Sequence, residues 1–193
     1  MTLPLYTSLL AAMLLITASQ TVKADIPSVV DSFDHQSKNN FGVARQLLTD
    51  QMAGGATSAT ASFNEGIMRV SGDISPARGQ PGWASTVLVL EPQGAPQNLS
   101  QYEGVALTIR INQGSLSVSA NSTDVTNFDY HASLVMAPSD GLFHTIKLPF
   151  DDMRRTWSQQ TDLNTETIQS LSIVAFGLQA GPFDFELDQV SFY

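Results

Sequence analysis

Apolar and polar residues alternate along this chain in short runs, and Gly, Pro, Asn and Asp separate the runs. The clearest run is 104–112, where Val105, Leu107, Ile109 and Ile111 share one face. A period of two is typical of an antiparallel strand with one buried face. No comparable stretch after residue 24 has the spacing of an amphipathic helix. Further strands are expected at 29–33, 42–48, 57–64, 67–72, 84–90, 128–134, 142–148, 172–178 and 182–193.

Three of these segments carry additional information. Within 182–193 the apolar positions change parity between Leu187 and Val190, which predicts a β-bulge near Asp188 and Gln189. The segment 164–170 predicts one helical turn with Asn164 or Asp162 as its N-cap. The segment 128–134 places its apolar residues on one face (Phe128, Tyr130, Ala132 and Leu134) and its polar residues on the other (Asp129, His131 and Ser133). About ten strands and almost no helix predict an all-β fold of two antiparallel sheets packed face to face.

The N-terminus has the pattern of an export sequence. The apolar run 9–18 has ten residues, too few for a helix to cross a bilayer, which takes about 20. It fits the hydrophobic region of a signal peptide spanning 1–24, with cleavage after Ala24. The alternative is an uncleaved N-terminal anchor. We therefore expect one exported domain at 25–193, periplasmic or secreted, without stable membrane insertion after cleavage.

Composition narrows the range of partners. Removing the predicted leader leaves eight basic and 18 acidic residues, a net charge of −10, and this charge repels nucleic acid and anionic lipid. The chain has no cysteine, so no disulfide can form even in an oxidising compartment. Packing, or a bound calcium ion, would have to supply any extra stability.

The best candidate for a binding site is the segment around Trp157. Its ring and the guanidinium groups of Arg154 and Arg155 suit a sugar or a peptide carboxylate, and Trp83 could add a second ring. The alternative is structural: Trp157 closes an open end of the sandwich, and the arginines pair with Asp151 or Asp162.

Two further groups of residues have both a binding and a structural interpretation. Gly54 and Gly55 could form a backbone nest for an anion, or a turn that requires positive φ; Met52 beside them is expected in the core. Asp31, Asp34 and Asp188 would meet if the first and last strands were neighbours, and their oxygens suit calcium. No other cofactor is expected.

Catalytic motifs are missing from the sequence. The three histidines are scattered without zinc-ligand spacing, and no G-x-S-x-G is present. Asp151 and Asp152 are adjacent and are expected in a solvated loop. We therefore predict a protein that is not an enzyme.

Five segments occur in the order found in one known family. They are 50–58 (DQMAGGATS), 69–75 (RVSGDIS), 99–104 (LSQYEG), 143–157 (FHTIKLPFDDMRRTW) and 180–188 (AGPFDFELD). Together they resemble the complex I intermediate-associated protein 30 family across roughly 30–193. Where that family usually has Asn-Asn-Gly-Gly-Phe, this chain has 79–83 (GQPGW).

The resemblance implies a galactose-binding-domain-like jelly roll, a fold shared with many carbohydrate-binding modules. It also implies a protein-binding, assembly-factor-like role, since mitochondrial members resemble assembly chaperones for respiratory complex I. The alternative is a carbohydrate-binding module, so the partner is a protein or a glycan. A carbohydrate site requires an aromatic platform formed by Trp83 or Trp157, whereas a protein site requires an exposed apolar patch.

Overall fold

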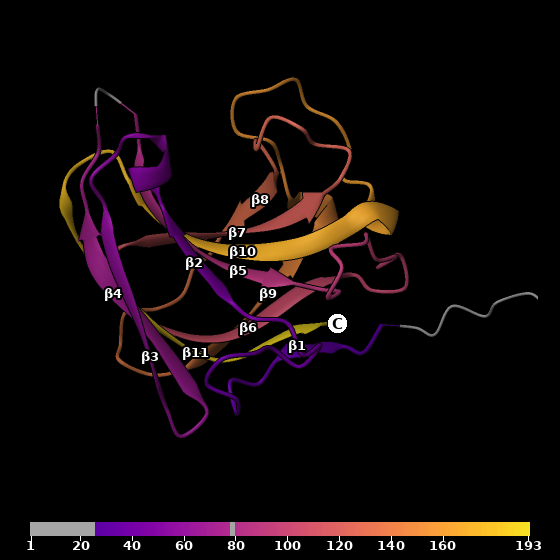
Figure 1. Cartoon of the computed structure of the whole chain (residues 1–193), viewed down its shortest axis with the longest axis horizontal. Helices are drawn as coiled ribbons and strands as arrows, with labels where there is room; N and C mark the ends of the chain where they lie inside the picture. The colour runs from indigo at the N-terminus through magenta and orange to yellow at the C-terminus, as the bar shows by residue number, and fades with distance from the viewer. Residues whose placement is uncertain (1–25, 78–79) are drawn as a thin grey trace, which may run out of the picture.

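Two antiparallel sheets pack face to face in the computed structural model, which describes residues 26–77 and 80–193 (Figure 1). The predicted signal peptide, 1–24, lies outside the described residues. None of the described helices is long and apolar enough to cross a membrane. Within the described residues there are three short 3-10 helices, η1 (Asp50–Ala53), η2 (Phe150–Asp152) and η3 (Thr165–Thr167).

The six-stranded sheet has the order β3-β4-β11-β6-β9, and β1 also pairs with β11. The first and last strands are therefore neighbours, as expected, with Val29 opposite Ser191. The strand bounds are β1 (Val29–Asp31), β3 (Ser58–Asn64), β4 (Ile67–Ile74), β6 (Gly104–Gln113), β9 (His144–Pro149) and β11 (Gly181–Phe192).

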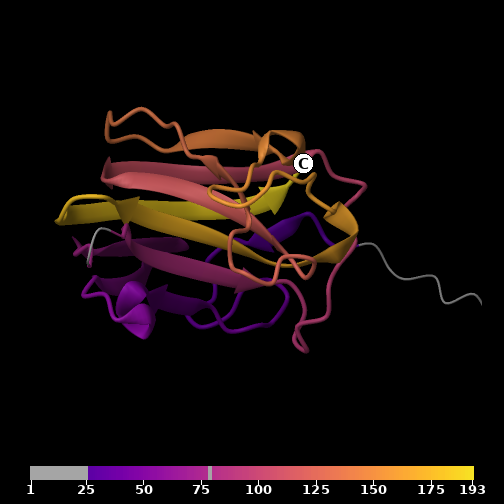
Figure 2. The same ribbon diagram turned by 90° about the horizontal axis from the view of Figure 1, so that it is seen from above.

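The five-stranded sheet has the order β2-β5-β10-β7-β8. Its strands are β2 (Gln46–Thr49), β5 (Gly82–Val89), β7 (Ser115–Ser122), β8 (His131–Leu134) and β10 (Ile168–Gly177). The hydrophobic core fills the space between the sheets, and its members include Leu107, Ile109, Leu171, Ile173 and Phe185. Figure 2 shows the same arrangement turned by 90°.

Several expected details are confirmed. Val105, Leu107, Ile109 and Ile111 are all buried on one face of β6. The register between β11 and β6 shifts between Leu187 and Gln189, where the parity change predicts a bulge. Asn164 caps η3 by accepting a hydrogen bond from the Glu166 backbone N–H.

Two expectations about strands were wrong. β7 was not expected, although Leu116, Val118 and Ala120 alternate with serines along it. The segment 128–134 has the opposite orientation: Asp129 and His131 are buried, whereas Phe128 and Leu134 are exposed. Asp129 is fully hydrogen-bonded, and His131 Nε2 lies 2.7 Å from the Thr161 carbonyl oxygen, whereas His131 Nδ1 is buried without a hydrogen-bond partner among the described residues.

Candidate binding site

The face of the five-stranded sheet that points away from the core is the centre of the candidate site. Cross-strand partners point to the same side, and Leu171, Ile173 and Ala175 of β10 point into the core. The alternate residues and their partners therefore form what we name the outer face. Its rows are Leu48–Ser85–Val174–Ser117–Leu134, Gln46–Val87–Ser172–Ser119–Ala132, Val89–Ser170–Asn121 and Trp83–Phe176–Ser115.

One end of the outer face is polar and rigidly hydrogen-bonded. The Asn121 side-chain amide donates to Ser170 Oγ (3.0 Å) and to Ser172 Oγ (2.8 Å), and Ser119 Oγ donates to Asn121 Oδ1 (2.9 Å). All four residues are 7% exposed or less. Since the two serine hydroxyls accept from Asn121, their own protons remain free to be donated. The other end is apolar, with the half-buried Trp83 next to Phe176.

On one side of the outer face, a buried carboxylate fixes the loop that carries Trp157. Asp129 Oδ1 accepts from the Thr156 N–H (2.8 Å), and Oδ2 accepts from the N–H groups of Trp157 (3.1 Å) and Ser158 (2.6 Å). Burial would raise the pKa of this carboxyl, but these hydrogen bonds outweigh burial and hold its pKa below the usual value. Arg155 adds a hydrogen bond from Nε to the Asp129 carbonyl oxygen (3.1 Å).

The loop fixed in this way presents aromatic side chains to solvent. Trp157 is 71% exposed and Phe128 is 78% exposed. Phe128 has positive φ (63°) and packs edge-on against Tyr130, with ring centroids 6.4 Å apart. Asn127 Nδ2 donates to Ser158 Oγ (2.9 Å), so the segments 127–130 and 155–158 lie side by side.

A second buried carboxylate fixes η1. Asp50 accepts hydrogen bonds from the Thr57 N–H (2.9 Å), the Thr57 hydroxyl (2.7 Å) and the Trp83 N–H (3.1 Å). Gly54 follows η1 with φ of 84°, in the left-handed region. Gly55 lies so close to Asp50 that an added Cβ would be 2.3 Å from its Cγ. The result is a compact turn that leaves Met52 73% exposed.

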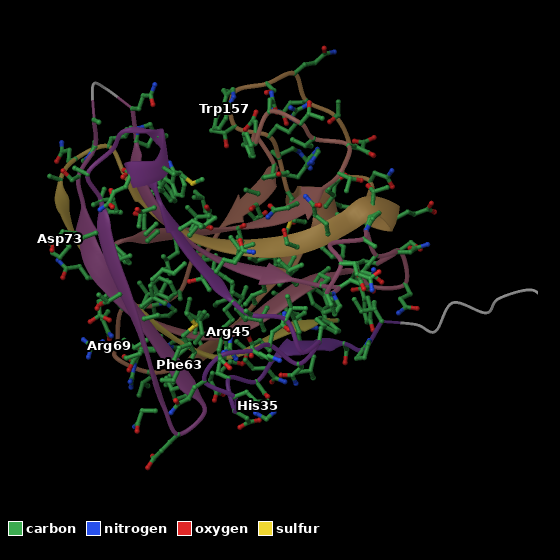
Figure 3. All side chains as sticks on the ribbon, viewed as in Figure 1. His35, Arg45, Phe63, Arg69, Asp73 and Trp157 are labelled. Carbon is green, nitrogen blue, oxygen red and sulfur yellow. The ribbon has the colours of Figure 1, made fainter. Side chains whose placement is uncertain are left out.

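The two fixed loops lie at opposite margins of the outer face, one beside β2 and the other beside β8. Figure 1 shows η1 and the loop that follows η2 rising separately from the same side of the sandwich, and Figure 3 labels Trp157 on the second of them. The sheet therefore carries an exposed aromatic side chain at one margin and an exposed methionine at the other.

The structure divides the predicted binding residues between two places. Arg154, Arg155 and Trp157 lie on one loop, whereas Gly54, Gly55 and Trp83 lie around Asp50. Trp157 is exposed, which contradicts the alternative in which it closes the sandwich. Arg155 is bound to Asp129 and Asn127, and Arg154 Nη1 donates to the carbonyl oxygens of Asp151 and Met153, so neither arginine pairs with the carboxylate expected for it. Gly54 has the positive φ that the turn interpretation predicts, and Met52 lies outside the core, contrary to expectation.

The three aspartates proposed for calcium do not form a common ligand set. Both oxygens of Asp31 bind Arg45, at 2.6 Å to Nε and 2.7 Å to Nη2, and this guanidinium also lies about 5 Å from the rings of Phe33 and Phe63 (5.1 and 5.0 Å). Among residues 26–77 and 80–193, no group of three or more His, Cys, Asp or Glu could hold a metal ion. A cationic side chain therefore occupies the oxygens of Asp31.

Sequence reasoning missed the residues that shape this site. Asp50 opens the first of the five family segments and lies four residues before Gly54 and Gly55, and this position could have indicated that it fixes the turn. Asp129 gave no such signal, because its alternation with Phe128 and Tyr130 assigned it to the solvent side. Asn121 was missed together with β7.

Solved structures share this architecture. The chain is similar to the family 11 carbohydrate-binding module of the cellulosomal cellulase Lic26A-Cel5E of Clostridium thermocellum, at 17% identity and a TM-score of 0.60, covering 88% of this chain and 95% of that one. The Clostridium thermocellum module in complex with a β-1,3-1,4-mixed-linked tetrasaccharide gives 17% identity and a TM-score of 0.59, covering 88% and 96%. An agarase, AgWH50C, gives 10% identity and a TM-score of 0.55, covering 84% of this chain and 24% of the agarase.

At these identities the similarity is one of fold, and it confirms the predicted jelly-roll sandwich. No curated protein sequence matches the chain. A family model described as complex I intermediate-associated protein 30 matches residues 33–187, most of the described chain. This chain belongs to the complex I intermediate-associated protein 30 family.

Proposed function

We propose that this chain is a non-catalytic binding domain whose ligand is a glycan, held on the outer face with Trp157 as the stacking ring. The observation that carries the proposal is the 71% exposure of Trp157 on a loop already ordered by Asp129. An indole that packed for stability alone would be buried. A loop backbone ordered before the ligand arrives loses less entropy on binding than a mobile loop does.

Two further features support a glycan. Sugar rings have apolar faces and hydroxyl rims, and the outer face offers half-buried aromatic rings at one end and hydroxyl groups at the other. The Clostridium thermocellum module of the same fold was solved with a bound tetrasaccharide. Both features favour a carbohydrate-binding module over a protein-binding domain.

The direct test compares Trp157→Ala with the unchanged protein in affinity electrophoresis and calorimetry against a panel of soluble polysaccharides. We expect Trp157→Ala to lower affinity at least tenfold, about 1.4 kcal/mol, and Trp157→Phe to lose less. The chain has two tryptophans, Trp83 and Trp157, so Trp83→Phe leaves Trp157 as the only indole for fluorescence titration.

Leu142→Ala is the matched control for these variants. Leu142 is also an exposed large apolar residue, 62% accessible, but its neighbour Gly141 contacts Arg110 of the six-stranded sheet. This substitution should leave glycan affinity unchanged. Equal affinity of Trp157→Ala and the unchanged protein would contradict the proposed site.

A protein partner is the second candidate, as the family implies, and one observation favours it. Exposed aliphatic and thioether side chains, which suit adaptable protein contacts, occur at Met52, Leu134, Met136 and Leu178. If no glycan in the panel binds while Met52→Ser and Leu134→Ser weaken the contact with a purified partner, the protein candidate replaces the glycan.

We also propose that the chain acts outside the cytoplasm after cleavage at Ala24. Support comes from Ile26, which is already packed in the core and whose carbonyl oxygen accepts from the Tyr102 hydroxyl (2.7 Å). A core that includes Ile26 is compatible with a mature chain that starts at Asp25. Sequencing the N-terminus of the exported protein should show Asp25 first; an N-terminus that retains residues 1–24 would contradict cleavage.

A further inference from the structure

The charged residues of this protein are divided unequally between its two sheets. None of the five described strands β2, β5, β7, β8 and β10 contains an Asp, Glu, Lys or Arg. Their one titratable residue, His131, is opposite Ala120 and faces away from the outer face. The strands of the six-stranded sheet instead carry Asp31, Arg69, Asp73, Arg110, Lys147, Asp184, Glu186 and Asp188.

The solvent side of the six-stranded sheet neutralises much of its own charge. Arg69 binds Asp184, and Arg110 binds Glu186. The hydrogen bonds from these guanidinium groups hold the pKa of both carboxyls below the usual range. A solvated sheet face built this way is ordinary for a soluble protein. The uncharged outer face is the exception in a chain with a net charge of −9.

In the described loops beside the outer face, exposed carboxylates outnumber exposed cationic groups. Asp50 and Asp129 are buried and hydrogen-bonded, and Arg155 is bound to Asn127 and Asp129. Arg154 is exposed, pairs through its backbone with Ala132 of the outer face, and donates to two carbonyl oxygens, which do not neutralise its charge. Three carboxylates of the same segment, Asp151, Asp152 and Asp162, are also exposed and together would repel a negatively charged chain.

We infer that the glycan bound on the outer face is an uncharged polysaccharide, and that chains carrying uronate or sulfate groups are rejected; this rests on the proposed function. A carboxylate or sulfate placed over these strands would lose hydration, and none of the five strands beneath it carries an opposite charge. A neutral sugar loses only hydroxyl–water contacts, and the free protons of Ser170 and Ser172 can replace some of them. Its apolar ring face contacts Trp157.

The test uses paired polysaccharides at two ionic strengths. Neutral β-glucan, xylan and galactan are compared with alginate, polygalacturonate and a sulfated galactan, by calorimetry in about 20 and about 500 mM NaCl. We expect binding only to neutral chains, with less than about a twofold change in affinity between the two salt concentrations, because no ion pair is screened.

A charge placed on the outer face should weaken binding of the neutral polysaccharide. Ser117→Asp puts a carboxylate between Val174 and Leu134, and it should lower affinity for the neutral chain at least tenfold. Thr60→Asp puts the same charge on exposed β3 of the other sheet, and affinity should stay unchanged.

The outcomes separate this inference from the proposed function. Binding of an acidic chain that weakens in high salt and is lost in Trp157→Ala would overturn the inference and leave the glycan proposal intact. Binding of none of the six polysaccharides would overturn both.

Discussion

Asp50 and Asp129 have the same role on two sides of the outer face. Each carboxylate is buried and accepts hydrogen bonds from backbone N–H groups: Asp129 from the loop 156–158, and Asp50 from Thr57 and from Trp83 at the start of β5. Those N–H groups have no strand partner, so the carboxylate supplies the acceptor that secondary structure does not. The two carboxylates thus hold the backbone of the segments that carry the exposed side chains of Met52 and Trp157.

Asp129→Asn tests this role at one residue. The amide keeps the size of the carboxylate, but its NH₂ group replaces one of the two accepting oxygens. Either the Thr156 N–H or the N–H groups of Trp157 and Ser158 therefore lose their acceptor. We expect the free energy of unfolding at neutral pH to fall by about 1–3 kcal/mol, the cost of an unsatisfied buried donor. Urea denaturation measures the change. Asp151→Asn is the control, since Asp151 is exposed, and it should behave like the unchanged protein.

The same variant should alter the pH dependence of stability. Backbone hydrogen bonds outweigh burial and lower the folded-state pKa of Asp129, so its contribution is complete above about pH 4, the usual aspartate pKa. The contribution is lost as pH falls through the lower folded-state pKa. The difference in melting temperature between the unchanged protein and Asp129→Asn should therefore shrink in acid. A constant difference across pH would argue against the ionised carboxylate as the cause.

Gly55→Ala is the corresponding test for η1. The new methyl group would lie 2.3 Å from Asp50 Cγ, so Asp50 must move away from Thr57 and Trp83. Overpacking of this kind costs about 1–3 kcal/mol in the free energy of unfolding. Gly181→Ala is the control, because its Cβ would meet nothing within 4 Å, and it should change stability by less than about 0.5 kcal/mol. Similar denaturation midpoints for the two variants would contradict the close approach at Gly55.

Strands with one purely apolar face could be predicted from the sequence, and strands that present serine or a buried polar group could not. β6 and β11, including the bulge, follow from alternation because their inward residues are Val, Leu, Ile and Phe. β7 was hidden since serine is also frequent in turns. The orientation of β8 was wrong because its buried side holds His131, which only a three-dimensional partner, Thr161, makes acceptable.

The connection between β1 and β2 depends on one buried ion pair. The side chains of Asp31 and Arg45 are 0% and 5% exposed, and Asp31 also accepts from the Phe33 N–H (2.9 Å). Arg45→Met keeps much of the aliphatic length but leaves the carboxylate without its cation. We expect the free energy of unfolding to fall by about 3–5 kcal/mol, as for other buried pairs that lose one partner.

A surface pair provides the control for Arg45→Met. Arg69 is solvent-exposed, so Arg69→Met should change the denaturation midpoint little. If both variants shifted the midpoint equally, burial would not be the source of the effect at Arg45. The double variant Asp31→Asn with Arg45→Met should recover part of the loss, because no unpaired charge is then buried.

At the scale of the whole molecule, the fold could be recognised from five motifs in order, whereas the site could not. The polar end of the outer face joins Asn121 to Ser170 and Ser172, about 50 positions apart (49 and 51), through the pairing of β7 with β10. No local pattern encodes that meeting. The absence of charge from five strands was visible in the sequence, but it acquired meaning only once those strands proved to form one sheet.

The thermal stability of the whole domain should not depend on calcium. The chain has no cysteine, its core fills the space between the sheets, and both oxygens of Asp31 are already bound by Arg45. We expect the melting temperature to be the same in excess EDTA and in about 1 mM calcium, since hard-oxygen sites need several free ligands. Magnesium at the same ionic strength is the control for general screening of this acidic chain. A rise of several degrees with calcium but not with magnesium would restore a structural calcium site and would require Arg45 to leave Asp31.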